Sequence, residues 1–227
     1  MMKRTMIAAA MFSIVVAAPA RAETPRELLL DAAFDTRDKD DALRKLDRAQ
    51  GEAAAQVARA PGDRDARLSM AMAVGYRAKL TKSRGEAMSA KRMFDGLAAS
   101  DPRDPEAAAA VGCWHLDSVI ELGGMIAGMA LGAKKATGFA AMDRAVALGG
   151  GRAMFPGLAG LLRVAIDPDD ARGRALIDLA THGLTPEKID RIMQRNAATV
   201  LAQLRAGRAS VAQSFAKELL PFGRVKR

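Results

Sequence analysis

The residue types that most often do chemistry are scarce, with one cysteine and two histidines in 227 residues. His115 and His182 fall in different predicted helix pairs, and Cys113 lies two residues before His115, on a diverging side of the same helix. A zinc site needs several donors around one ion, so no metal site is expected. Cys113 stands between Gly112 and Trp114 on an apolar stretch, and a buried small hydrophobe is favoured over a reactive thiol.

Two further patterns could bind ions. Five aspartates fall within 31–41 and could suggest a calcium loop. However, Arg37 and Lys39 interrupt them, and Leu46 stands where such a loop needs glutamate. A solvent-exposed helix cap with charge pairs is therefore favoured. The segment 149–152 could hold an anion, although a plain helix terminator is favoured. Nucleophile elbows and phosphate loops are absent from the sequence. We therefore expect no catalytic residue, no cofactor and no enzyme; an enzyme would need acids or His115 to converge in a pocket.

Five residues are candidates for contact with a partner. His115, Asp117 and Glu121 share one predicted helix and could lie on a groove wall, where a histidine can sense pH or bind a carboxylate. A position of His115 in the core is an equally open alternative. Met125 and Met129 belong to an apolar, methionine-rich run that could accept a hydrophobic partner segment, although ordinary core is favoured.

The elements that must position these residues are predicted to be helices. The chain is 50% hydrophobic but only 4% aromatic, and alanine, leucine, methionine, arginine and lysine favour helix over strand. Short Pro, Gly and Asp signals divide the helical segments. The predicted fold class is all-α, with antiparallel helix pairs over 25–33, 40–60, 65–79, 86–99, 106–122, 134–148, 155–166, 169–181, 185–206 and 210–220.

Residues 1–22 have the pattern of a secretory signal peptide. Lys3 and Arg4 precede an apolar run of about 13 residues, too short for a membrane span, and Ala20 and Ala22 are the small residues of a cleavage site. We expect cleavage after Ala22 and a periplasmic or secreted protein, with an uncleaved anchor as the alternative. Cleavage would lower the formal net charge of +9 by three.

Small and large residues recur at spacings that suit closely packed helix pairs. Ala90, Phe94 and Pro102 keep one such spacing, and Gly138, Met142 and Ala145 keep it again, with Gly150 as terminator. Gly75 and Gly112 take the small position of the preceding helices, and Trp114 is the expected core anchor. These segments, within 65–181, resemble tetratricopeptide-repeat (TPR) units of secreted bacterial proteins.

The resemblance implies a right-handed superhelix with a concave groove over one domain, 23–220, followed by a frayed basic tail at 221–227. The first hypothesis is a non-enzymatic periplasmic scaffold that binds a protein or peptide in the groove. The second is a small-molecule carrier similar to the TPR-like component of some TRAP-type transporters, which a closed apolar cavity lined by Met125, Met129 and Trp114 would favour.

Basic residues are spread along the chain without interleaved aromatic residues, which argues against binding of single-stranded nucleic acid. A transient contact with an anionic membrane surface or an acidic partner remains open.

Overall fold

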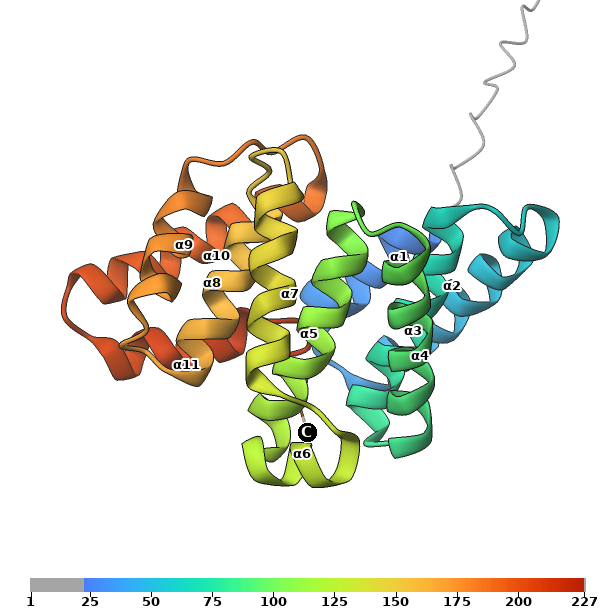
Figure 1. Ribbon diagram of the computed structural model, residues 1–227, viewed down its shortest axis with the longest axis horizontal. Helices are drawn as coiled ribbons and strands as arrows, with labels where there is room; N and C mark the ends of the chain where they lie inside the picture. The colour runs from blue at the N-terminus through green and yellow to red at the C-terminus, as the bar shows by residue number, and fades with distance from the viewer. Residues whose placement is uncertain (1–22, 227) are drawn as a thin grey trace, which may run out of the picture.

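The computed structural model describes residues 23–226, and this part of the chain is all-helical and contains no strand (Figure 1). The all-α prediction is therefore confirmed. The eleven α-helices within it are α1 (Pro25–Leu30), α2 (Lys39–Arg59), α3 (Arg64–Thr81), α4 (Arg84–Ser100), α5 (Pro105–Leu122), α6 (Gly124–Leu131), α7 (Lys135–Leu148), α8 (Met154–Ile166), α9 (Ala171–Thr181), α10 (Lys188–Arg205) and α11 (Ala209–Leu219). A single π-helical turn, Asp31–Asp35, continues α1.

Short polar side chains set the helix starts. Each accepts a hydrogen bond from a backbone N–H of the first turn, which has no partner inside the helix. Asp38 caps α2, so the predicted cap at Asp40 or Asp41 is late by two or three residues. The other side chains that cap in this way are Thr24, Asp63, Ser83, Asp104 and Asp170.

Successive helices pack against each other and reverse direction at short turns. Helices α1 to α4 form one end of the molecule, α8 to α11 form the other, and α5 and α7 lie between them (Figure 1). The short helix α6 interrupts the alternation, and α7 is the helix that returns along α5. The N-termini of α1, α3, α5, α8 and α10 therefore lie at one end of the stack. The site described below depends on this arrangement.

Helix pairs approach closely where the sequence places small residues. A Cβ at Gly112 would lie 2.6 Å from the Met142 sulfur, and one at Gly138 would lie 2.6 Å from Leu116 Cγ, so α5 and α7 meet at glycine. A Cβ at Gly75 would lie 3.4 Å from the Ala90 Cβ and from the Phe94 ring. Among the other residues predicted to pack helix pairs together, Trp114 and Ala145 are buried, and Pro102 is exposed at a turn.

The apolar run 125–131 forms α6, which stands between two glycines with positive φ, Gly123 (77°) and Gly132 (70°). Ala127 is buried, but Met125 and Met129 are 79% and 76% exposed. The favoured interpretation of this run as ordinary core is therefore wrong for its methionines. The run is helical, yet it projects from the helix stack instead of filling it (Figure 1).

The C-terminal residues are also placed differently from the prediction. Phe222 and Val225 are buried, the Phe222 N–H donates to the Ala33 carbonyl at 2.8 Å, and the Lys226 N–H donates to the Arg37 carbonyl at 3.0 Å. The expectation of a frayed tail is thus corrected, because two apolar side chains anchor this segment against the π-helical turn and its flank.

The predicted signal peptide, 1–22, lies outside the described residues, as does Arg227. None of the helices in the described part of the chain combines the length and apolar character needed to cross a bilayer.

Candidate functional site

A mostly apolar cavity of about 280 Å³ lies between α3 and α5, with contributions from α1, α4, α6, α8 and α10. Glu106, Ala110, Cys113, Asp117 and Glu121 line it from one face of α5, at steps of three and four residues. From Glu106 to Leu122 this face is roughly 24 Å long, at a rise of about 1.5 Å per residue. The cavity is therefore elongated along the helix axis, and we call it the apolar cavity.

The walls of the apolar cavity are mostly hydrocarbon. Trp114 is one of them, and its indole N–H donates to the Ala87 carbonyl at 2.8 Å, which leaves the ring to cover the cavity. Large side chains that also line the walls are Leu29, Phe34, Leu68, Met72, Phe94, Leu158, Ile189 and Met193. Such a surface suits an apolar occupant, with a few polar groups left to orient it.

Three of the polar groups that line the cavity belong to Tyr76, Cys113 and Asp117. Burial is the main cause that raises the pKa of the Tyr76 phenol and of the Cys113 thiol far above their usual values, so both stay protonated. The Tyr76 ring meets Phe222 edge-on at 5.0 Å, and its hydroxyl has no hydrogen-bond partner among the described residues. Asp117 is also nearby, held at 3.1 Å by the Lys79 ammonium.

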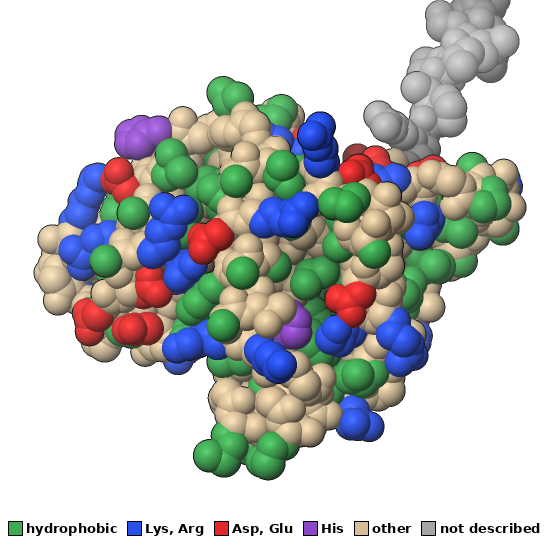
Figure 2. Space-filling view, viewed as in Figure 1, with side chains coloured by type: hydrophobic (Ala, Val, Ile, Leu, Met, Phe, Trp, Pro, Cys, Tyr) green, Lys and Arg blue, Asp and Glu red, His purple; other side chains and the backbone are tan. Residues whose placement is uncertain are grey.

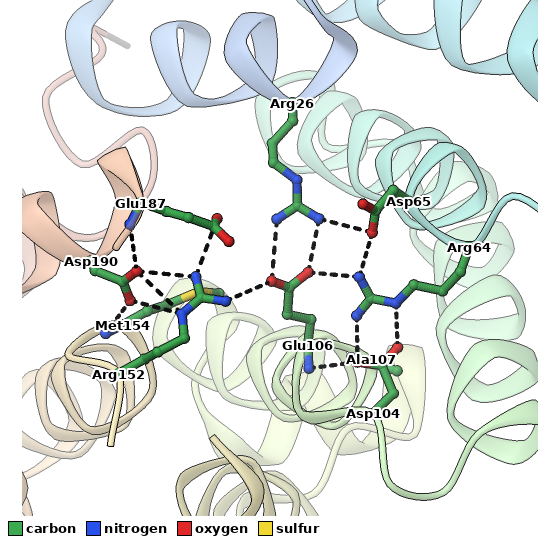
Figure 3. A network of polar contacts seen from close by, with 10 residues as sticks. All are labelled: Arg26, Arg64, Asp65, Asp104, Glu106, Ala107, Arg152, Met154, Glu187 and Asp190. Atoms are coloured by element: carbon green, nitrogen blue, oxygen red, sulfur yellow. Dashed lines mark hydrogen bonds and ion pairs between the residues drawn. The ribbon is translucent and has the colours of Figure 1, made fainter. Parts of the chain in front are cut away.

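An ion-pair network borders one end of the apolar cavity, where Arg26 and Glu106 belong to the cavity lining. We define the network as Arg26, Arg64, Asp65, Asp104, Glu106, Arg152, Glu187 and Asp190 (Figure 3). Glu106 is its centre, 8% exposed. Its carboxylate accepts from Arg26 at 2.9 and 3.3 Å and from Arg64 at 3.0 Å, and Arg152 lies at 3.5 Å. Three arginines from three parts of the chain thus converge on one carboxylate.

Two buried aspartates hold these arginines in place. Asp190, which is 0% exposed, pairs with Arg152 at 3.1 Å and also accepts from the Met154 and Glu187 N–H groups, each at 3.1 Å. Asp104 pairs with Arg64 along one guanidinium edge, where Nε and Nη2 each donate to one oxygen of the carboxylate. It also caps α5 by accepting two backbone N–H bonds.

The electrostatic balance of the network favours ionised carboxylates. Burial opposes the charge of Glu106, but hydrogen bonds and charges from Arg26 and Arg64 outweigh it and hold the pKa below its usual range. Burial likewise opposes the charge of Asp104, and its bonds from Arg64 and the Ala107 N–H lower the pKa. Carboxylates that stay ionised are better suited to structural ion pairs than to donating or accepting protons in catalysis.

The other end of the apolar cavity lies at the C-terminal end of α5, beside α6. The Lys82 ammonium pairs with Glu121 at 2.8 Å, and the Arg84 Nε–H donates to the Ala130 carbonyl at 2.8 Å. Leu122 and Leu131 complete the lining there. This end therefore presents cations and exposed hydrocarbon together.

The structure separates the residues proposed for partner contact. Asp117 and Glu121 line the apolar cavity, whereas Met125 and Met129 lie outside it on α6. His115 is 5% exposed, does not line the cavity, and accepts at Nδ1 from the Lys134 N–H at 3.2 Å. Burial, followed by the charge of Lys91, lowers the pKa of this imidazole.

Sequence reasoning missed the ion-pair network and Tyr76. The members of the network fall at or beside the first turns of alternate helices: Arg26 in α1, Arg64 in α3, Glu106 in α5, Arg152 before α8 and Asp190 in α10. Charges of both signs at the starts of every other helix are the signal that could have indicated it. Nothing in the sequence distinguishes Tyr76 from an ordinary core aromatic.

No protein-family model matches the chain, and no curated protein and no solved structure is significantly similar to it.

Proposed function

We propose that this protein is a non-enzymatic carrier that binds an elongated, largely apolar small molecule, of the fatty-acid type, in the apolar cavity. The observation that carries the proposal is the cavity itself, about 280 Å³ in volume and extended along one whole face of α5. Packed interiors contain few voids larger than a water molecule, so an apolar space of this size is a candidate binding site.

The polar groups of the cavity support a ligand with one polar end. The half-buried Tyr76 side chain lines the cavity, and its hydroxyl is a donor without a partner among the described residues. A carboxylate or carbonyl oxygen beside it would satisfy that donor. Among the described residues Arg84 has no carboxylate within ion-pair distance, so the α6 end offers a second position for an anionic head.

A carrier accounts for the cavity better than the peptide-binding scaffold that the repeat spacing first suggests. A peptide groove needs open backbone and side-chain access over several residues, whereas hydrocarbon side chains line most of this space and the ion-pair network borders one end of it. The expected signature of a carrier is a cavity lined by Trp114 and the methionines of α6. Trp114 is present in the wall and the methionines are not.

The proposal includes a TPR-like architecture and export. It is supported by glycine-mediated helix pairing at Gly75, Gly112 and Gly138 and by the signal-peptide pattern of residues 1–22. An intact-mass measurement of the exported protein tests the export: a mass starting at Glu23 supports cleavage after Ala22, and retention of residues 1–22 contradicts it.

Binding can be measured through Trp114, the only tryptophan in the sequence. Energy transfer from Trp114 to a fluorescent polyene fatty acid should saturate at one ligand per chain. Ala110→Phe places a ring in the cavity wall and should weaken the affinity about tenfold or more, since about 1.4 kcal/mol of lost contact suffices. Ala140→Phe, at an exposed position on α7, is the matched control and should bind as the parent does.

Native mass spectrometry of freshly purified protein provides a second readout, because a carrier often retains its ligand. Absence of saturable energy transfer, or equal affinity in Ala110→Phe and Ala140→Phe, would remove the apolar cavity as the binding site.

A further inference from the structure

We infer that the α6 tip, residues 122–132, docks on a membrane surface rich in anionic lipid and places the adjacent end of the apolar cavity against the bilayer. Within the described residues the tip carries the two most exposed large hydrophobic side chains, Met125 (79%) and Met129 (76%). Ile126 (54%) and Leu122 (37%) are exposed beside them. Figure 2 shows hydrophobic side chains projecting from the lower end of the molecule, where α6 lies in Figure 1.

The geometry of the tip suits shallow insertion. Met125 and Met129 are four residues apart and therefore share one face of α6, opposite the buried Ala127. Eight helical residues are about 12 Å long, which is too short to span a bilayer but long enough to lie at its interface. Within the described chain α6 packs on α5 and α4, which leaves its outer face open.

The charges around the tip match an anionic surface. From Leu122 to Met142 the sequence contains no acidic residue and two lysines, Lys134 and Lys135. Neither lysine has a carboxylate within ion-pair distance among the described residues, and the same is true of Arg84, which is bonded to α6. Apolar insertion combined with cations is the two-signal arrangement that gives stable membrane contact.

A bilayer fits this surface better than a protein does. A stable protein interface buries roughly 800 Å² per partner from about 20 residues or more, and the tip offers four exposed large side chains on a convex end. Leu122, Ala130 and Leu131 belong to both the tip and the cavity lining. Docking would therefore let a ligand pass between lipid and cavity with little exposure to water, a consequence that rests on the proposed carrier function.

The test is sedimentation of the full chain with vesicles of equal parts phosphatidylcholine and phosphatidylglycerol. Met125→Ser combined with Met129→Ser should lower the partition constant about tenfold or more, since two inserted side chains are lost. Leu179→Ser combined with Leu184→Ser removes exposed leucines elsewhere and is the matched control, expected to change it less than about twofold. Lys134→Gln combined with Lys135→Gln, or high salt, should also weaken binding, and pure phosphatidylcholine should bind least.

Hydrogen exchange locates the contact, since vesicles should slow exchange in 122–132 whether or not residues 1–22 remain. The inference is overturned if the methionine and leucine variants partition equally, or if vesicles do not slow exchange in 122–132. It is also overturned if the parent protein self-associates and the methionine variant does not, because the tip would then bind a second copy of the chain. Fatty-acid binding measured without vesicles separates the two proposals, because it tests the cavity and not the tip.

Discussion

At the scale of single residues, the structure gives the two histidines different positions. His115 is buried between α5 and the start of α7 and is bonded through Nδ1, while His182 lies after α9 and is more accessible. The sequence left two positions for His115 equally open, the core and a groove wall, and the structure places it in the core. A buried neutral imidazole makes the stability of the fold depend on pH.

We predict that the free energy of unfolding falls as the pH drops below about 6.5. Burial lowers the pKa of His115 in the folded protein, so the unfolded chain binds the proton first and acid favours unfolding. His115→Gln should flatten the dependence of the unfolding free energy on pH below about 6.5. Chemical denaturation at several pH values measures this slope, with His182→Gln as the matched control. An unchanged slope in His115→Gln would contradict the assignment.

At the scale of helices, glycine has two opposite roles. A Cβ at Gly96, within α4, would meet nothing from another helix within 4 Å, whereas a Cβ at Gly138 would meet Leu116 at 2.6 Å and His115 at 3.0 Å. The first glycine only weakens its helix, and the second permits α5 and α7 to approach. The same substitution should therefore have opposite effects at the two positions.

We predict that Gly138→Ala destabilises the protein by about 1 to 3 kcal/mol, because overpacking at the α5–α7 contact outweighs the helix propensity of alanine. Gly96→Ala should stabilise it by up to about 1 kcal/mol, since only propensity changes there. Thermal and urea unfolding of both variants measure the difference. An increase in the unfolding free energy of Gly138→Ala would contradict this prediction, because it would show that α5 and α7 can move apart to admit the methyl group without loss of stability.

The helices themselves were predictable from sequence because their signals are local. Asp and Ser caps and Pro turns placed most boundaries within a few residues of those observed. The cavity was not predictable, since Cys113 and Trp114 look like core residues whether the space beside them is filled or empty. The α6 tip was misjudged for a related reason: a run of apolar residues does not reveal whether a partner helix covers it.

At the scale of the whole molecule, the ion-pair network joins both ends of the helix stack. Arg26 belongs to α1, and Asp190 belongs to α10, yet both connect through Arg152 and Glu106 (Figure 3). The bonded residues are up to 80 positions apart in the sequence, as Arg26 and Glu106 are. Local sequence patterns therefore could not predict this network. The network is therefore a feature of the assembled fold.

We predict that Glu106→Gln lowers the free energy of unfolding by about 2 to 3 kcal/mol, because it removes the carboxylate shared by three arginines. The value is below that of a fully buried pair, since Arg26 and Arg64 keep about a third of their side chains exposed. Asp65→Asn, at a carboxylate that is 68% exposed, should cost less than about 1 kcal/mol. Denaturant unfolding compares the two variants.

The pH dependence checks the same assignment independently. Because the pKa of Glu106 is lowered in the folded state, its contribution is complete above the ordinary glutamate value near 4.5 and is lost as the pH falls below that value. Glu106→Gln should therefore lose less stability than the parent on acidification below about pH 4.5. Parallel acid-unfolding curves for the two proteins would contradict the role given to Glu106.

The buried C-terminal segment has a consequence for how the molecule forms. In a simple helical array each unit contacts only its neighbours, so the array can grow and fray from either end. Here Phe222 and Lys226 bond to the Ala33 and Arg37 carbonyls, and Pro221 completes the cavity wall. Residues 33–37 and 221–226 therefore gain order together, and the wall of the apolar cavity is incomplete until both segments are in place. Unfolding of the described residues should be all-or-none, without fraying from residues 221–226.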